Sequence, residues 1–192
     1  MLKDLLRASR SYRSFDESIK ITPEQLANWV DHTRYAPSSI NLQMLKFVAV
    51  TNESLCARLL AGTRWAGKIK DMQLPPEGHA PVAYIVICAD KNVVPTAETF
   101  EKDVGICAQT IMLAASEAGF GGCMLGSFSP DVVRETLELA EHLVPKLVLA
   151  LGKPDERVEL VDEAADGSVT YYRECGIHYV QKRKLENILI QK

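Results

Sequence analysis

The sequence predicts a mixed α/β or α+β domain, a layered fold in which helices outnumber strands. Three observations lead to this prediction. Helical and strand patterns alternate along most of the chain, in the order α, α, β, α, β, α, β, α, β, before an irregular end. Buried strand patterns are apolar on both faces, as in a sheet covered by helices. The length of 192 residues suits one sizeable core, so we expect a single domain over residues 1–192.

The first half of the chain begins with a short apolar segment and then a strong helix over residues 22–36. Thr22 is its candidate N-cap, Pro23 fits the first helical position and Gln25 completes a capping box. The next patterns are a strand ("KFVAVT"), a helix ("NESLCARLLAG") and a long irregular connection over residues 63–80. Long loops inside a compact domain are more often functional than inert.

The second half contains the longest predicted helix, residues 96–120, between buried strands. Beyond Asp103 this helix is apolar nearly all round, so we expect it to be buried, at a central position or at a subunit interface. The other patterns are the buried strands "PVAYIVICAD" and "KLVLALG", a short strand or turn "GCMLGSF", a helix opened by Ser129 and Pro130, a hairpin or loop "TYYRECGIHYV", and a basic turn with an apolar tail, "KRKLENILI".

Composition excludes several classes of protein. The net charge is −3 and no dense stripe of Lys and Arg is present, which argues against nucleic-acid binding. The N-terminal residues do not resemble a signal peptide and the apolar runs are too short to span a bilayer, so a cytoplasmic protein is expected. The five cysteines form no CxxC pair and the four histidines are scattered. We therefore expect neither a disulfide framework nor a metal site.

Familiar catalytic and nucleotide-binding motifs are missing. The glycine-rich stretch "GFGGCMLG" has Met124 where a dinucleotide fingerprint needs glycine, and a helix precedes it while a strand follows. The sequence contains no GxxxxGK[ST], no GxSxG and no Ser-His-Asp set that spacing would justify. Sequence motifs therefore identify neither a catalytic nucleophile nor a pair of catalytic acids.

Four polar loops remain, and each allows a plain and a functional interpretation. "SRSYRSF" is either a solvated loop or an anion site made by arginine forks and serine hydroxyls. "APSSINLQ" either caps and turns or offers amides to the edge of a planar heterocycle. The glycine of "CMLGSF" permits a close approach of a ligand to the backbone. "QKRK" is either a solvated tail or part of an anion site.

Together and in this order, these loops resemble the FMN-dependent nitroreductase family. The resemblance covers almost the whole chain through "SRSYRSF", "APSSINLQMLKFVAV", "DVGICAQTIMLAASEAGFGGCMLGSF", "LALGKPDE" and the closing "YYRECGIHYVQKRKLENILI". It implies a homodimer of α+β architecture, with a central, mainly antiparallel sheet flanked by helices and FMN held at the subunit interface.

The resemblance also implies roles for particular residues. Arg10, Ser11 and Arg13 would hold the phosphate and ribityl end of FMN, with Arg13 near the pyrimidine edge. The partner subunit would supply a second group, and a turn would place backbone groups against the flavin ring. Lys182 and Arg183, or Lys184 instead, would complete the phosphate site. The partner's group is Pro37, Ser38, Ser39, Asn41 and Gln43, and the turn is Leu125, Gly126 and Ser127.

Two departures from the family pattern concern the substrate side. Met44 and Leu45 stand where the family often has Pro-Trp, and the segment 63–80 is short beside larger members. That segment contains Trp65, Lys68 and Lys70, and one of the lysines could meet an anionic substrate.

The function implied is an NAD(P)H-dependent oxidoreductase that reduces nitroaromatics, quinones or related acceptors by ping-pong kinetics. No catalytic side chain is required, because the flavin carries the hydride chemistry. Alternatives are an FMN carrier or sensor without turnover, a flavin enzyme of different chemistry on this fold, such as dehalogenation or flavin cleavage, and an unrelated α/β domain without a cofactor.

Overall fold

A computed structural model describes residues 1–66, 72–95 and 101–192 of the chain. The chain divides into two compact units, Met1–Pro154 and Asp155–Lys192, and each is described by itself. The expectation of one domain over residues 1–192 stays a prediction.

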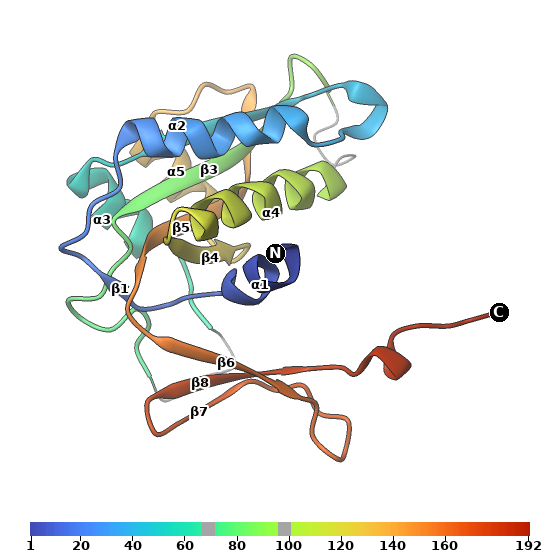
Figure 1. Ribbon diagram of the computed structural model, residues 1–192. Coiled ribbons are helices and arrows are strands. Elements are labelled where there is room, and N and C mark those ends of the chain that lie inside the picture. Colours follow the sequence, from blue (N-terminus) through green and yellow to red (C-terminus); the bar gives the residue numbers. More distant parts are fainter. Residues whose placement is uncertain (67–71, 96–100) are drawn as a thin grey trace. The chain divides into compact units, whose positions relative to one another are not determined.

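The described part of the N-terminal unit forms a five-stranded antiparallel sheet (Figure 1). β2 (Leu45–Val50) pairs with β3 (Ala83–Asp90), which pairs with β5 (Leu143–Pro154). β5 also pairs with β4 (Gly121–Leu125) and, at its end, with β1 (Phe15–Asp16). β3 and β4 pair with the same residues of β5, so they lie on opposite sides of it. Consequently β2 and β4 occupy opposite edges of the sheet.

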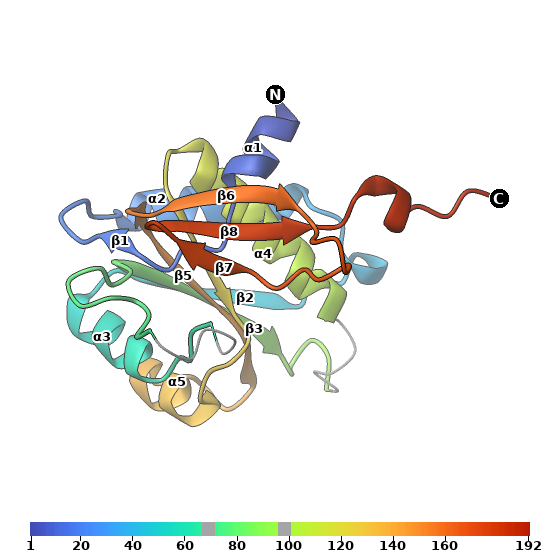
Figure 2. The same ribbon diagram turned by 90° about the horizontal axis from the view of Figure 1, so that it is seen from below.

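Helices cover both faces of this sheet (Figures 1 and 2). α2 (Pro23–Asp31) and α4 (Glu101–Glu117) pack on one face, and α3 (Glu53–Ala61) and α5 (Pro130–Leu137) pack on the other. A further helix, α1 (Leu2–Ala8), has no buried residue and lies against the end of α4. The unit is therefore a sheet between two helical layers, as the two-sided apolar strands predict.

Side-chain alternation along β3 explains how one strand serves both layers. Ile85 and Ile87 belong to the core beneath α2 and α4, while Tyr84 and Val86 belong to the core beneath α3 and α5. Every residue of β3 is buried. Successive side chains of a strand point to opposite faces, so a strand with helices on both sides must be apolar throughout.

Helix boundaries follow the predicted capping signals. The hydroxyl of Thr22 accepts from the main-chain nitrogen of Gln25, whose side chain accepts from the nitrogen of Thr22, which confirms the capping box at α2. The hydroxyl of Ser129 accepts from the main-chain nitrogen of Val132 and so caps α5. After α2 the chain continues as a short 3₁₀ helix, η1 (His32–Tyr35), and leaves helical geometry at Ala36.

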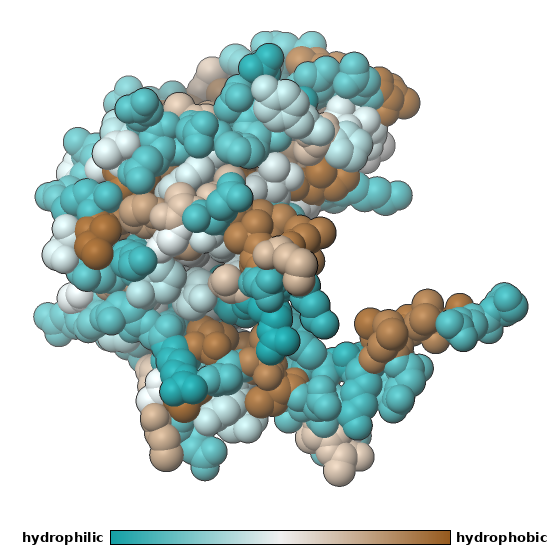
Figure 3. Space-filling model, viewed as in Figure 1, coloured by the Kyte–Doolittle hydropathy of each residue, from teal (hydrophilic) through white to brown (hydrophobic). Residues whose placement is uncertain are grey.

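The C-terminal unit is a three-stranded sheet among its described residues. β7 (Tyr172–Glu174) and β8 (Ile177–Lys182) form the predicted hairpin, with Cys175 and Gly176 at positive φ in the turn. β6 (Arg157–Asp162) runs parallel to β8 and was not predicted. The tail contains a single 3₁₀ turn, η3 (Leu185–Asn187), and its apolar side chains are exposed (Figure 3).

The fold class is confirmed: this is an α+β protein with a mainly antiparallel central sheet flanked by helices. The predicted long helix differs in detail. It ends at Glu117, and its expected start falls partly on residues 96–100, which lie outside the described residues. It is also not buried all round, because Gly105 and Gln109 are exposed in the single chain.

Candidate functional site

The segment "SRSYR" is attached to the glycine-rich strand β4. The main-chain nitrogen of Tyr12 donates to the carbonyl oxygen of Gly122 over 2.9 Å, and Ser11 forms an isolated parallel bridge with Gly122. A Cβ on Gly122 would lie 2.2 Å from the carbonyl oxygen of Ala150 in β5, and one on Gly121 would lie 2.6 Å from the Tyr12 ring. These glycines therefore permit close packing of three segments, which explains the motif that failed as a dinucleotide loop.

Arg10 is half-buried beside this junction. Its Nη2 atom donates to the carbonyl oxygen of Leu6, which fixes the guanidinium against the end of α1. Its Nε atom is buried and has no hydrogen-bond partner among the described residues. Burial lowers the pKa of Arg10 from its ordinary value, an effect partly opposed by Tyr12. A shielded guanidinium with an unused donor matches the chemistry of a phosphate, which accepts several hydrogen bonds.

Ser11 and Arg13 complete this cluster. Ser11 is exposed, and its carbonyl oxygen accepts from Nη1 of Arg13 over 3.1 Å. Arg13 is half-buried. The predicted group Arg10, Ser11 and Arg13 is thus gathered at the start of β4, with two positive charges in a small region.

The predicted turn Leu125–Gly126–Ser127 lies at the other end of β4. Leu125 is buried in the core, whereas Gly126 and Ser127 are exposed. A Cβ on Gly126 would meet no atom within 4 Å, so its backbone is open to a ligand. The carbonyl oxygen of Ser127 accepts from the nitrogen of Arg64 over 2.9 Å, which ties the turn to the segment after α3. A strand rises about 3.3 Å per residue, so Gly122 and Gly126 are about 13 Å apart along the direction of β4.

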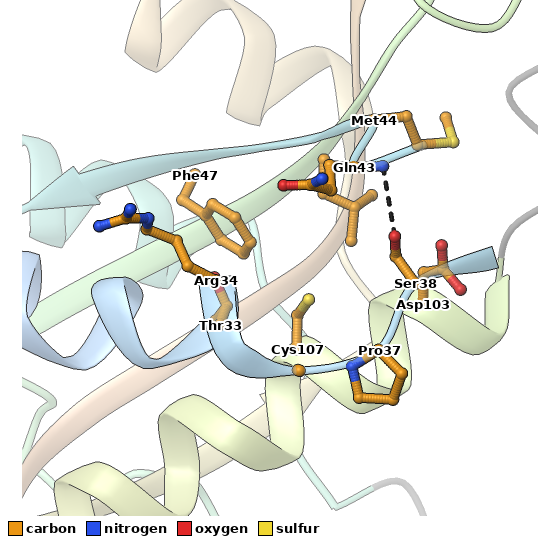
Figure 4. Close-up of a pocket in the computed structure, with 11 residues that line it drawn as sticks. Thr33, Arg34, Pro37, Ser38, Gln43, Met44, Phe47, Asp103 and Cys107 are labelled. Carbon is orange, nitrogen blue, oxygen red and sulfur yellow. Dashed lines mark hydrogen bonds between the residues drawn. The ribbon is translucent and has the colours of Figure 1, made fainter. Parts of the chain in front are cut away.

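The loop over residues 37–43 forms the third cluster, and it lines a pocket of 140 Å³ (Figure 4). Asn41 and Gln43 are exposed, and Nε2 of Gln43 donates to Oδ1 of Asn41 over 3.1 Å. The main-chain nitrogen of Gln43 contacts Oγ of Ser38 at 3.4 Å. Met44, at a position of departure from the family pattern, is buried and belongs to the pocket wall. The exposed amides can donate and accept at the edge of a planar ring.

Ser39 differs from its neighbours because its donors turn inward. Its main-chain nitrogen lies 3.1 Å and 3.0 Å from the two carboxylate oxygens of Asp103, and its hydroxyl donates to Oδ1 over 2.8 Å. Asp103 lies in the first turn of α4 and is only 3% exposed. Sequence reasoning gave Asp103 no role, although an acid at the start of an otherwise apolar helix was a usable signal.

The described chain does not bring all predicted residues to one place. The 37–43 loop leads into β2 at one edge of the sheet, and β4 carries the other two clusters at the opposite edge. Three strand spacings of about 4.8 Å separate these edges, or about 14 Å. Trp65 donates through Nε1 to Oγ1 of Thr63 over 2.9 Å, and Lys68 and Lys70 lie outside the described residues.

The basic run at the end of the chain belongs to the C-terminal unit. Lys182 ends β8, and Nη1 of Arg183 lies 3.4 Å from Oε2 of Glu163. The main-chain nitrogen of Lys184 donates to the same carboxylate over 3.1 Å. Hydrogen bonds from the Asn187 side chain and the Lys184 backbone lower the pKa of Glu163, with a smaller contribution from the charge of Arg183. The part of Lys182 and Arg183 in a phosphate site stays a prediction.

Within residues 1–66, 72–95 and 101–192, no three His, Cys, Asp or Glu side chains gather as metal ligands would. Across the same ranges, no helix has the length and apolar character needed to cross a membrane.

Comparison with known proteins finds flavin oxidoreductases and a shared fold among the similar proteins. The NAD(P)H-dependent FMN reductase of Bacillus subtilis is 27% identical over 189 residues, covering 84% of this chain and 71% of that protein. The NADPH-flavin oxidoreductase of Vibrio harveyi is 29% identical over 171 residues, covering 82% and 67%. The crystal structure of a nitroreductase family protein from Streptococcus pneumoniae superposes with a TM-score of 0.68 at 18% identity, covering 90% of this chain and all of that one, which shows the common fold.

The sequence model of the nitroreductase family matches residues 6–153 of this chain. These residues include the "SRSYR" segment, the 37–43 loop, α4 and β4. The match therefore includes the three clusters described above and most of the N-terminal unit. The predicted enzyme class and cofactors also agree with the names of the relatives. This chain belongs to the nitroreductase family.

Proposed function

We propose that the protein is an FMN-dependent oxidoreductase that takes a hydride from NADH or NADPH and reduces a nitroaromatic, quinone or related acceptor. The observation that carries the proposal is the arrangement along β4. A half-buried arginine with an unused Nε–H lies at one end of the strand, and an open glycine backbone lies at the other. The names of the relatives, which include an FMN reductase and a flavin oxidoreductase, support the same activity.

The chain's residues fit FMN as a group with an anionic end and a planar end. Arg10 binds the phosphate, which is nearly dianionic, and Arg13 lies toward the pyrimidine edge of the ring. Gly126 allows the ring to approach the main chain, and its neighbours offer backbone groups to the ring edge. FMN, when bound, supplies the hydride chemistry, so the protein needs no nucleophile of its own.

The amides of the 37–43 loop reach the same flavin from a partner subunit. The separation of about 14 Å between the two sheet edges supports this arrangement, because short polar side chains at the two edges of one chain do not meet directly. The partly exposed surface of α4 supports a homodimer, because Gly105 is open and Ile106 and Leu113 of the same helix are only half-buried. Burying such a helix against a second copy gives the apolar kind of interface found in obligate dimers.

Two half-reactions share one open flavin face under this proposal. Donor and acceptor then bind in turn, and double-reciprocal plots at several acceptor concentrations should be parallel, as in ping-pong kinetics. Intersecting lines would contradict a shared site.

The decisive experiment is the visible spectrum of the purified protein before and after anaerobic addition of NADH or NADPH. A yellow protein whose absorbance bleaches rapidly in a stopped-flow instrument is expected. Protein that stays colourless after FMN is added contradicts the proposal. Protein that binds FMN without rapid bleaching would instead be a carrier or sensor.

A further inference from the structure

We propose that Asp103 is a positioning residue that holds the 37–43 loop in its flavin-binding shape through Ser39, without touching the cofactor. The proposal rests on the proposed function in one respect, namely that this loop contacts FMN. The holding of the loop itself is independent of any ligand and can be measured separately.

The first step is the contact itself. The main-chain nitrogen of Ser39 donates to both carboxylate oxygens of Asp103, and the Ser39 hydroxyl donates to Oδ1. Hydrogen bonds to an ionised acceptor are stronger than neutral ones. The carboxylate lies in the first turn of α4, where the helix dipole favours negative charge. The buried carboxyl group of Asp103 thus takes its hydrogen-bond partners from the loop.

The second step is the strain of the loop. The φ values of three loop residues lie in the left-handed region: 48° for Ile40, 56° for Asn41 and 51° for Gln43. Residues other than Gly and Asn rarely adopt this backbone conformation. Ile40 is β-branched and 87% exposed, so packing of its side chain does not compensate. A backbone with this strain persists only when surrounding contacts determine it.

The third step is the origin of those contacts. Other hydrogen bonds of the loop, such as those from Asn41 to Ser38 and from Leu42 to Ser39, stay within it. Among the described residues, the bonds to Asp103 are the ones that join residues 37–43 to another element. Without them, the strained turn is expected to relax, and Asn41 and Gln43 then lose their fixed positions.

Cys107 provides a reporter for this relaxation. It lies one helical turn after Asp103 and lines the same pocket as Pro37 and Ser38 (Figure 4). It is buried, as are Cys56, Cys88 and Cys123, whereas Cys175 is exposed. In a Cys175→Ser background, a neutral maleimide should therefore react slowly with the parent chain. Loop opening should accelerate labelling at Cys107 alone, and labelling of the other buried thiols would mark global unfolding.

The labelling variants are Asp103→Ala, Asp103→Asn and Ser39→Ala. We expect acceleration at Cys107 of about tenfold for Asp103→Ala and about threefold for Ser39→Ala, which loses one hydrogen bond of the set. The Ser39 variant matters because the pKa of the Cys107 thiol is raised chiefly by burial and further by Asp103, so removing the acid alone makes the thiol more reactive. Ser39→Ala keeps that charge, so its acceleration reports the loop.

Flavin affinity is the second readout, measured by quenching of FMN fluorescence. The dissociation constant should rise about tenfold in Asp103→Ala, with a smaller rise in Asp103→Asn, whose amide oxygen still accepts. Glu101→Gln is the matched control, because it removes an exposed carboxylate from the same helical turn and should leave both readouts at parental values. If Asp103→Ala fails to fold, the Asn and Ser39 variants carry the same test.

Two results would overturn the proposal: unchanged labelling of Cys107 in Ser39→Ala and Asp103→Asn, or faster labelling with parental FMN affinity. Failure of the proposed function looks different. In that case the parent chain itself binds no FMN, while the labelling rates still decide whether Asp103 holds the loop.

Discussion

The main-chain nitrogen of Tyr12 donates to the carbonyl oxygen of Gly122 over 2.9 Å, and this contact sets where the arginines beside Tyr12 lie along β4. The contact requires a strand without side chains at its start, because β5 and the Tyr12 ring occupy the space on either side. Gly121 and Gly122 thus act on packing, and the groups that we propose to bind phosphate come from the segment packed against them.

The first prediction concerns two glycines of this region. In Gly122→Ala the new Cβ would lie 2.2 Å from the Ala150 carbonyl oxygen, which is backbone and cannot rotate away. We expect a loss of about 2 kcal/mol or more in the free energy of unfolding, measured by denaturant titration. Gly126→Ala is the matched control, because its Cβ meets nothing within 4 Å. Equal stabilities of the two variants would contradict the packing role, and FMN affinity should fall in Gly126→Ala despite its parental stability.

The second prediction concerns Arg10. Arg10→Ala removes a half-buried guanidinium whose Nε has no partner among the described residues, so FMN affinity should fall, and loss of the bond from Nη2 to the Leu6 carbonyl should also loosen the contact with α1. The dissociation constant of FMN should rise about tenfold to a hundredfold, which corresponds to the loss of about 1.5–3 kcal/mol expected for hydrogen bonds to a charged group. Arg7→Ala removes an exposed arginine from α1 and should change the affinity little. Parental FMN affinity in Arg10→Ala would count against the phosphate site.

Much of the fold could be predicted because local signals agreed with tertiary packing. The capping box of Thr22 and Gln25 and the two-sided apolar strand around Ile85 are local patterns, and both were confirmed. β6 was not predicted, for two reasons. Its residues are only partly buried, and its parallel pairing with β8 involves no local turn that could be recognised in the sequence. Sequence reasoning allowed α4 a place at a subunit interface, but apolar composition does not show which face of a helix is exposed in the single chain.

The site was predicted through a family pattern more than through geometry. Residues such as Arg10, Asn41 and Gly126 lie far apart in the sequence, and spacing alone cannot place them on one strand or at one sheet edge. Asp103 was missed for another reason. The role that we propose for it depends on the contact between Ser39 of the 37–43 loop and α4. Contacts of this kind, 64 residues apart between Ser39 and Asp103, have no local signature.

The third prediction concerns acid sensitivity of the C-terminal tail. The Asn187 side chain and the Lys184 backbone hold the pKa of Glu163 below its ordinary value of 4.5. Because the folded-state pKa is lowered, the stabilisation is fully present above about pH 4.5 and is lost as the pH falls through the folded-state pKa. The amide resonances of Lys184 and Asn187 should shift together in an NMR titration below that pH. In Glu163→Gln these resonances should no longer titrate. If they still shift over the same pH range, a group other than Glu163 causes the shift.

The fourth prediction tests whether one flavin is held by two subunits. Two differently tagged chains are co-expressed, one with Arg10→Ala and one with Asn41→Asp, and the mixed dimer is isolated by two affinity steps. Aspartate tolerates the positive φ of Asn41 and places a negative charge beside the anionic cofactor. The two homodimers, each with a single substitution in every site, should both bind FMN weakly.

The mixed dimer discriminates because the two substitutions are distributed differently in the two arrangements. If Arg10 and Asn41 of different chains meet at one flavin, one site carries both substitutions and the other carries none. Titration should then show one site of parental affinity per dimer, and a dimer of differently tagged parent chains should show two. If both residues served the flavin of their own chain, each site would carry one substitution and no site of parental affinity would remain. The outcome therefore decides whether the distance between the two edges of the sheet is bridged by a second copy of the chain.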